Sequence, residues 1–116
     1  MGRIVIAAYR PKSGRQQALE RLMRRHHERL RTEGLVTDRP PVLMRAGDGT
    51  MLEVFEWLSA DAIAAAHRRP ALQAMFEEYA DVSERVPLRE LEEAGELVAA
   101  FEPLQRDEAL HPEFSP

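Results

Sequence analysis

Residues 42–58, VLMRAGDGTMLEVFEWL, predict a β-hairpin around which the rest of the fold is arranged. Asp48 and Gly49 stand between two apolar runs, and an Asp-Gly pair accepts the positive φ angles of a tight primed turn. Side chains of the returning strand alternate between two faces. One face carries Glu53, Phe55 and Trp57, and the other carries Leu52, Val54, Glu56 and Leu58. Residues 42–46 and 51–58 are therefore expected to form two antiparallel strands.

The segment before the hairpin predicts a strand and a long amphipathic helix. Residues 4–9, IVIAAY, are apolar in both alternating sets, which is typical of a strand covered on both faces. Ser13 and Gln16 fit a capping box, so we expect the helix to begin there, and Gly34 suits its C-terminal end. The apolar residues of this helix recur at three- and four-residue steps and form one stripe: Leu19, Leu22, Met23, His26 and Leu30.

The segment after the hairpin predicts two helical pieces and a last strand. Ser59 suits the N-cap of a short helix, and Pro70 suits the first turn of a second helix. After the interruption at Pro87, residues 97–102, LVAAFE, predict the final strand. Residues 105–116 are interpreted as a flexible C-terminal tail or an arm that crosses to a partner.

The predicted order, β-α-β-β-α-β, is the split arrangement of the ferredoxin-like α+β fold. We expect one domain over residues 1–104, with an antiparallel four-stranded sheet that carries the helices on one face. Because the strands are apolar on both sides, the second face also needs a cover. A second copy of the same sheet is the simplest cover, which predicts a homodimer formed through the sheet faces.

Composition excludes several classes of site. The 116 residues include no cysteine, which excludes disulfides, thiolate nucleophiles and Cys-ligated metal centres. No apolar run approaches the roughly 18 residues of a membrane span, and the N-terminus lacks the features of a signal peptide. We therefore expect a cytoplasmic protein without a membrane partner. No His-x-x-x-His pair, glycine-rich phosphate loop or nucleophile elbow occurs, and no metal or other cofactor is expected.

Charge is distributed unevenly along the chain. Residues 1–45 hold 11 Lys and Arg against 4 Asp and Glu, whereas residues 46–116 hold 5 against 16. Nucleic-acid binding would need the arginines to be interleaved with exposed aromatic residues or to belong to a recognisable motif, and neither is present. We interpret them as the solvated face of the first helix and expect no nucleic-acid partner.

Few residues stand out as carriers of chemistry. Trp57, together with Phe55, can wall a pocket and stack on a flat aromatic ligand, or it can be a core residue. His67 follows an alanine-rich turn, where a neutral imidazole can act as a general base or be a satisfied histidine near a helix end. Arg45 can hold a ligand anion, or it can pair with Glu53 or Glu56 across the hairpin.

Four further residues have weaker signals. Tyr79 and Tyr9 can lend hydroxyl groups to a pocket, and both fit packing equally well. His26 lies on the apolar stripe of the first helix and is interpreted as a packed histidine at the edge of the core. A catalytic role for Glu53 is the lesser alternative to a charge at a strand edge or dimer interface.

Several segments together resemble a known group of proteins. They are IVIAAYRPKSG at 4–14, EWLS at 56–59, AAAH at 64–67 followed by Pro70, and FEPL at 101–104. Over residues 3–104 the chain resembles the dimeric α+β-barrel superfamily, and within it the small proteins that are like antibiotic-biosynthesis monooxygenases. The haem-degrading relatives carry an axial histidine on the helix that corresponds to residues 70–82. This chain has none there, which argues against haem.

The resemblance implies a cofactor-independent monooxygenase that acts on an electron-rich aromatic or quinol-type molecule. His67 would remove a phenolic or enolic proton, Trp57 would stack on the rings, and Arg45 would hold the anion while it reacts with dioxygen. The alternative is a non-catalytic dimer that binds a small hydrophobic ligand or serves as a stress-related accessory protein. A cavity of several hundred Å³ lined by Trp57 and His67 would favour an enzyme or a binder, whereas a filled interior would favour a structural role.

Overall fold

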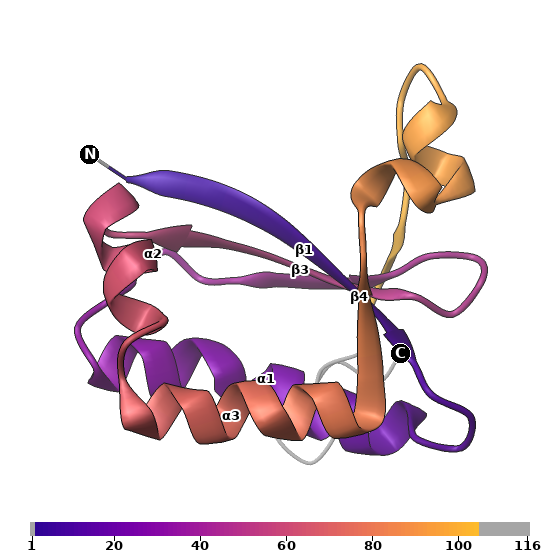
Figure 1. Cartoon of the computed structure of the whole chain (residues 1–116). Helices are drawn as coiled ribbons and strands as arrows, with labels where there is room; N and C mark the ends of the chain where they lie inside the picture. Colours follow the sequence, from indigo (N-terminus) through magenta and orange to yellow (C-terminus); the bar gives the residue numbers. More distant parts are fainter. Residues whose placement is uncertain (1, 105–116) are drawn as a thin grey trace, which may run out of the picture.

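The sheet is built around the hairpin of β2 (Val42–Arg45) and β3 (Met51–Trp57) and the long first strand, β1 (Arg3–Pro11). In the computed structural model, which describes residues 2–104, β1 pairs with β3 from Arg3 opposite Trp57 to Tyr9 opposite Met51. The described strands form one antiparallel sheet in the order β4-β1-β3-β2-β5 (Figure 1). The α+β class and the antiparallel sheet are thus as predicted, with five strands in place of four.

The hairpin forms where the sequence predicts it, but its turn is wider than a two-residue primed turn. Ala46 N–H donates to the carbonyl of Thr50, and Gly49 N–H donates to the carbonyl of Ala46. Only Gly49 has a positive φ, at 94°, while the Asp48 carboxylate accepts from the backbone N–H of Thr50 at 2.8 Å. This is a three-residue loop that ends on a left-handed glycine, the next most common way to close a hairpin.

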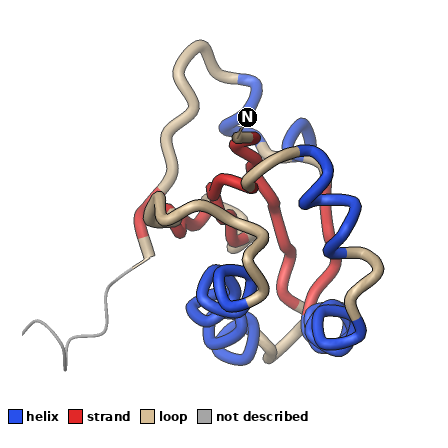
Figure 2. Tube along the Cα trace, turned by 90° about the vertical axis from the view of Figure 1, so that its left-hand side faces the viewer, coloured by secondary structure: helices blue, strands red, loops and turns tan. Residues whose placement is uncertain are grey.

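Three helices lie on one face of the sheet: α1 (Gln16–Thr32), α2 (Ala60–Ala66) and α3 (Pro70–Val82). Figure 2 shows them on the same side of the strands. The predicted stripe of α1 packs against β3 and α3, with Leu19, Met23, His26 and Leu30 buried and Leu22 half-buried, and Gly34 follows the helix with a φ of 73°. No helix within residues 2–104 combines the length and the apolar character needed to cross a bilayer.

The helix starts are only partly as predicted. Ser59 caps α2, because its hydroxyl accepts from the backbone N–H of Ala62 at 3.1 Å, and Pro70 occupies the first turn of α3. The capping box at Ser13 and Gln16 is wrong. Arg15 N–H donates to the carbonyl of Lys12 and closes a turn first, so that Arg15 is the N-cap residue of α1 and contributes no side-chain cap.

The prediction of a last strand over residues 97–102 is also wrong. The chain passes directly from α3 into β4 (Ser83–Val86), which pairs with β1 at one edge of the sheet. In the described part of the chain residues 97–101 pair with no strand, and Leu97 and Val98 are 103% and 81% exposed. Only β5 (Glu102–Pro103) returns to the sheet, beside β2 at the other edge. The polar sequence of β4, SERV, carries no strand signal because an edge strand can have exposed side chains.

Within residues 2–104, the outer face of the sheet, opposite the helices, is covered over one half only. The short turns η1 (Leu88–Glu90) and η2 (Glu92–Gly95) place Leu91 over Leu52, Ala8 and Ala46, and all four are buried. Beyond this cover the loop of residues 96–101 projects from the body (Figures 1 and 2). On the other half of this face, Ile4, Ile6 and Val42 remain exposed.

We expect Leu91→Ala to lower the free energy of unfolding by about 2–4 kcal/mol, because it removes the side chain that seals the covered half of the outer face. The matched change Leu88→Ala, at a more exposed leucine three residues earlier, should cost less than about 1 kcal/mol. Urea denaturation at one fixed protein concentration measures both. Equal costs for the two leucines would contradict this placement of the η1–η2 segment.

Candidate functional site

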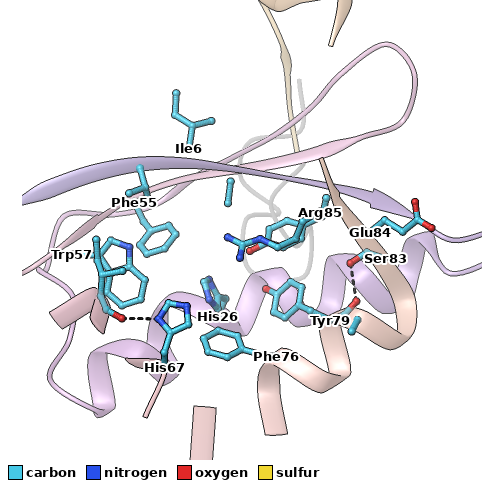
Figure 3. Close-up of a pocket in the computed structure, with 15 residues that line it drawn as sticks. Ile6, His26, Phe55, Trp57, His67, Phe76, Tyr79, Ser83, Glu84 and Arg85 are labelled. Carbon is cyan, nitrogen blue, oxygen red and sulfur yellow. Dashed lines mark hydrogen bonds between the residues drawn. The ribbon is translucent and has the colours of Figure 1, made fainter. Parts of the chain in front are cut away.

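A cavity of about 700 Å³ lies between the helices and the sheet, within the size range of small-molecule sites. Strands β1, β3 and β4 and all three helices contribute to its walls (Figure 3). Seven of its lining residues are aromatic or histidine, namely Tyr9, His26, Phe55, Trp57, His67, Phe76 and Tyr79. Of the predicted site residues, Trp57, Phe55, Tyr79 and His67 are thus brought together.

Two pairs of rings line this cavity, which we call the slot: Phe55 and Trp57, inclined to each other at 54°, and His67 and Phe76. On the sheet side, the ring centroids of Phe55 and Trp57 are 5.3 Å apart, and both rings point from β3 toward the helices. On the helix side, the ring centroids of His67 and Phe76 are 5.9 Å apart, at an interplanar angle of 33°. Aromatic walls on opposite sides suit a flat ligand that stacks between them.

His67 is the C-cap residue of α2, and a single contact determines which of its ring nitrogens faces a ligand. Nδ1 lies 2.9 Å from the carbonyl oxygen of Ile63, one turn earlier. Because a carbonyl only accepts, Nδ1 donates a proton and Nε2 keeps its lone pair when the imidazole is neutral. His67 is exposed, so this acceptor stands on the solvent side of the cavity.

Two buried tyrosines form another part of the wall, with ring centroids 4.8 Å apart. Burial, with a smaller contribution from the negative charge of Glu53, raises the pKa of Tyr9 to about 12. The same causes, in the same order, raise the pKa of Tyr79 well above its ordinary value. Both phenols are therefore neutral near pH 7, and the hydroxyl of Tyr79 has no hydrogen-bond partner among the described residues.

Arg45 is not in the cavity wall, contrary to its prediction as an anion-holding residue. Its guanidinium lies 3.6 Å from a carboxylate oxygen of Glu20 on α1. The predicted cross-hairpin pairing does not form either, because Glu53 contacts His26 and Glu56 accepts from Arg39 and Thr37. The arginine that lines the cavity is Arg85, a residue with no sequence signal because β4 was not predicted.

Arg85 places a cation at the sheet edge of the cavity. Its guanidinium carbon lies 5.9 Å from the centroid of the Tyr9 ring, within cation–π range. Register explains the contact, since Arg85 is directly opposite Tyr9 in the β1–β4 pairing. An exposed guanidinium at this place can attract and orient a ligand anion.

The second missed feature is a buried pair formed by His26 and Glu53. Nδ1 of His26 lies 2.7 Å from Oε1 of Glu53, and the two residues are 3% and 0% exposed. His26 does lie on the buried stripe of α1 as expected, but it lines the cavity. The sequence does contain a signal for this pair. His26 lies on the apolar stripe of α1, and Glu53 lies on the face of β3 that also carries Phe55 and Trp57.

Comparison with protein-family models, curated proteins and solved structures gives no significant match for this chain. Within the described residues, no three His, Asp or Glu side chains are grouped so as to hold a metal ion. The polar groups in the cavity wall are imidazoles, phenols, a carboxylate, a serine hydroxyl and a guanidinium.

The tyrosine pKa shift predicts a loss of stability at alkaline pH. Below pH 10 Tyr9 is protonated in both states, and between pH 10 and about 12 it ionises in the unfolded chain only. The unfolding free energy should therefore fall across this interval by roughly 2–3 kcal/mol for Tyr9. Urea denaturation at stepped pH should show a smaller fall for Tyr9→Phe than for the unchanged chain. Parallel curves of unfolding free energy against pH for the two proteins would contradict the raised pKa of Tyr9.

Proposed function

We propose that the protein binds a flat, hydroxylated aromatic molecule in the slot and oxygenates it without a metal or organic cofactor. The observation that carries this proposal is the cavity itself, in which two aromatic walls meet a histidine acceptor and an arginine. A ring system between Trp57 and Phe76 would be held by stacking and by loss of apolar surface from water. Proton acceptors beside it would then act on a ligand hydroxyl.

The chemistry follows from what happens to an electron-rich phenol once its proton is removed. Nε2 of His67 takes the proton, and Arg85 stabilises the anion in the role first predicted for Arg45. The anion delivers electrons to dioxygen, a C–O bond forms at a ring carbon that carries hydrogen, and the His67 imidazolium returns its proton to the terminal peroxide oxygen. The resulting hydroperoxide breaks its O–O bond and releases water, so the ring carbon becomes a carbonyl and one dioxygen is consumed.

Binding without catalysis is the second candidate, and the mostly apolar lining of the cavity supports it. Both candidates need the slot to accept an aromatic ligand. They differ in oxygen consumption, which is expected only for the enzyme.

We test this with alizarin, a flat tricyclic dye, and with dithranol, a hydroxyanthrone that dioxygen can oxidise. Calorimetry should show alizarin binding that Trp57→Phe weakens by about 3- to 10-fold, since part of the stacking surface is lost. An oxygen electrode should show dithranol-dependent uptake that His67→Asn slows at least about tenfold. Phe101→Ala, on the outer face, is the control for both.

Each result separates the candidates. Alizarin binding without dithranol-dependent oxygen uptake would support the second candidate, ligand binding without catalysis. If neither dye nor hydroxyanthrone binds, or if the two site substitutions act only by lowering the melting temperature, the proposed function is wrong.

We also propose that a second copy of the chain covers the exposed half of the outer face. Ile4 and Val42 are 59% and 52% exposed there, and Ile6 and Val54 lie between them in the strand register. Four neighbouring apolar side chains on one sheet face form the kind of patch that marks an interface. A two-fold related copy would bury the same patch on both chains.

Light scattering at micromolar concentration should give about twice the chain mass of 13.2 kDa. Val42→Glu should shift the mass toward that of one chain, because it buries a charge on each side of the interface. Gln17→Glu, which adds the same charge on exposed α1, is the control. A single-chain mass for the unchanged protein would refute the dimer.

A further inference from the structure

The buried pair of His26 and Glu53 joins the long helix to the central strand at the wall of the cavity. Glu53 on β3 is fully buried beneath α1, and its contact with His26 spans 27 residues of sequence. A lone carboxylate in such a place is costly, and the short contact to an imidazole N–H offsets part of that cost. Because Nδ1 donates to Glu53, the neutral imidazole keeps its lone pair on Nε2.

Polar atoms without partners gather around this pair. Oε2 of Glu53 and the hydroxyl of Tyr79 are buried and have no hydrogen-bond partner among residues 2–104. The ring of Tyr79 stands edge-on to that of His26, with centroids 5.4 Å apart. No hydrogen bond to another described residue uses Nε2 of His26. Buried polar groups are nearly always satisfied, so the hydroxyl of Tyr79 and Nε2 of His26, whose residues line the cavity, need partners that water or a polar ligand group can supply.

We infer that His26 is a proton acceptor for a second ligand hydroxyl, which lies in the buried middle of the slot away from the hydroxyl that His67 acts on, and that Glu53 positions the His26 ring. The inference rests on the proposed function, because it requires a hydroxylated aromatic ligand in this cavity. The proton passes from the ligand oxygen to Nε2 of His26, and no electron changes hands in this step. The imidazolium that forms is then held between the Glu53 carboxylate and the ligand anion.

His26 and His67 have different surroundings. His67 is exposed, and its Nδ1 donates to a neutral carbonyl, which provides no countercharge for an imidazolium. His26 is buried, and its Nδ1 contacts the Glu53 carboxylate. A general base and the group that orients it are arranged in this way. Figure 3 shows His26 between the end of the slot at His67 and Trp57 and the end at Tyr79 and Arg85.

The charged and titratable groups of every element around His26 are compatible with this role. Glu53 on β3 supplies the negative charge. Tyr9 on β1 and Tyr79 on α3 stay neutral because burial raises the pKa of each phenol, so the hydroxyl of Tyr79 can donate to the ligand anion. On β4, Arg85 attracts the anion and Glu84 lies beside it in the cavity wall, and His67 follows α2.

This arrangement selects a class of ligand. A flat molecule whose acidic hydroxyl lies beside His26 and Tyr79 satisfies both the imidazole and the tyrosine hydroxyl. A ligand of the same shape without that hydroxyl leaves these buried groups without partners, and sites built in this way discriminate strongly. The slot therefore favours phenols, naphthols and quinols over plain aromatic hydrocarbons.

The experiment uses the colour of alizarin, whose anion absorbs at longer wavelength than the neutral dye. With the full chain in excess, the apparent pKa of bound alizarin should fall by at least about one unit, a tenfold change in its ionisation constant. His26→Asn should abolish most of this shift, because the amide NH₂ can still donate to Glu53 but the side chain has no basic nitrogen in place of Nε2. Glu53→Gln should reduce the shift while alizarin still binds, as expected of a positioning residue.

Two histidine controls locate the effect. His27→Asn makes the same change one residue along α1, where the imidazole contacts the carbonyl of Thr37, and should leave the shift intact. His67→Asn should leave most of the shift in place although it slows oxygen uptake. If His67→Asn removes the shift and His26→Asn does not, the inference is wrong.

The failures of the two proposals are distinguishable. Alizarin that binds and quenches Trp57 but keeps its shifted colour in His26→Asn would overturn the role of His26 and leave the proposed function standing. Absence of binding by both alizarin and dithranol would overturn both. If His26→Asn does not fold, as judged by circular dichroism, the near-isosteric Glu53→Gln is the deciding variant. An undiminished pKa shift of bound alizarin in Glu53→Gln would refute the proposed role of the His26–Glu53 pair.

Discussion

The pairing of β1 with β3 is the constraint on which the rest of the structure depends. Its register sets Ile6 opposite Val54 and Tyr9 opposite Met51, and strand alternation then directs Glu53, Phe55 and Trp57 toward the helices. A slip by one residue would turn this whole set to the outer face and remove the sheet-side wall of the cavity. The carboxylate of Glu53 has a partner only in this register, because His26 faces it from α1.

The sequence was sufficient wherever the determining pattern is local. The hairpin, the stripe of α1, the N-cap at Ser59 and the first turn at Pro70 all depend on neighbours within a few residues. Trp57 and His67 could be placed at one cavity because a strand end and the helix that follows it remain close in space. These features follow from periodicity and capping alone.

What the sequence did not predict depends on distant contacts. Residues 83–86 become a strand because the edge of β1 is available to pair, while the more apolar segment 97–101 finds no partner in the described structure. Because β4 forms, Arg85 lies in the cavity wall, whereas Arg45 pairs with Glu20 outside it. The pair of His26 and Glu53 spans two elements, and each residue alone is typical of a packed histidine or an interface charge.

The junction of α3 with β4 has a consequence for motion. No loop separates them, and the hydroxyl of Ser83 donates to the carbonyl of Tyr79 at 2.7 Å, while Lys12 N–H donates to the carbonyl of Val82. Tyr79 and Arg85 therefore belong to one mechanical unit, anchored at one sheet edge by four paired residues. Short edge strands are among the segments that open at low free-energy cost. Separation of β4 from β1 would widen the slot and at the same time move the Arg85 guanidinium away from it. Access to the cavity and the positive charge at its edge would therefore change together.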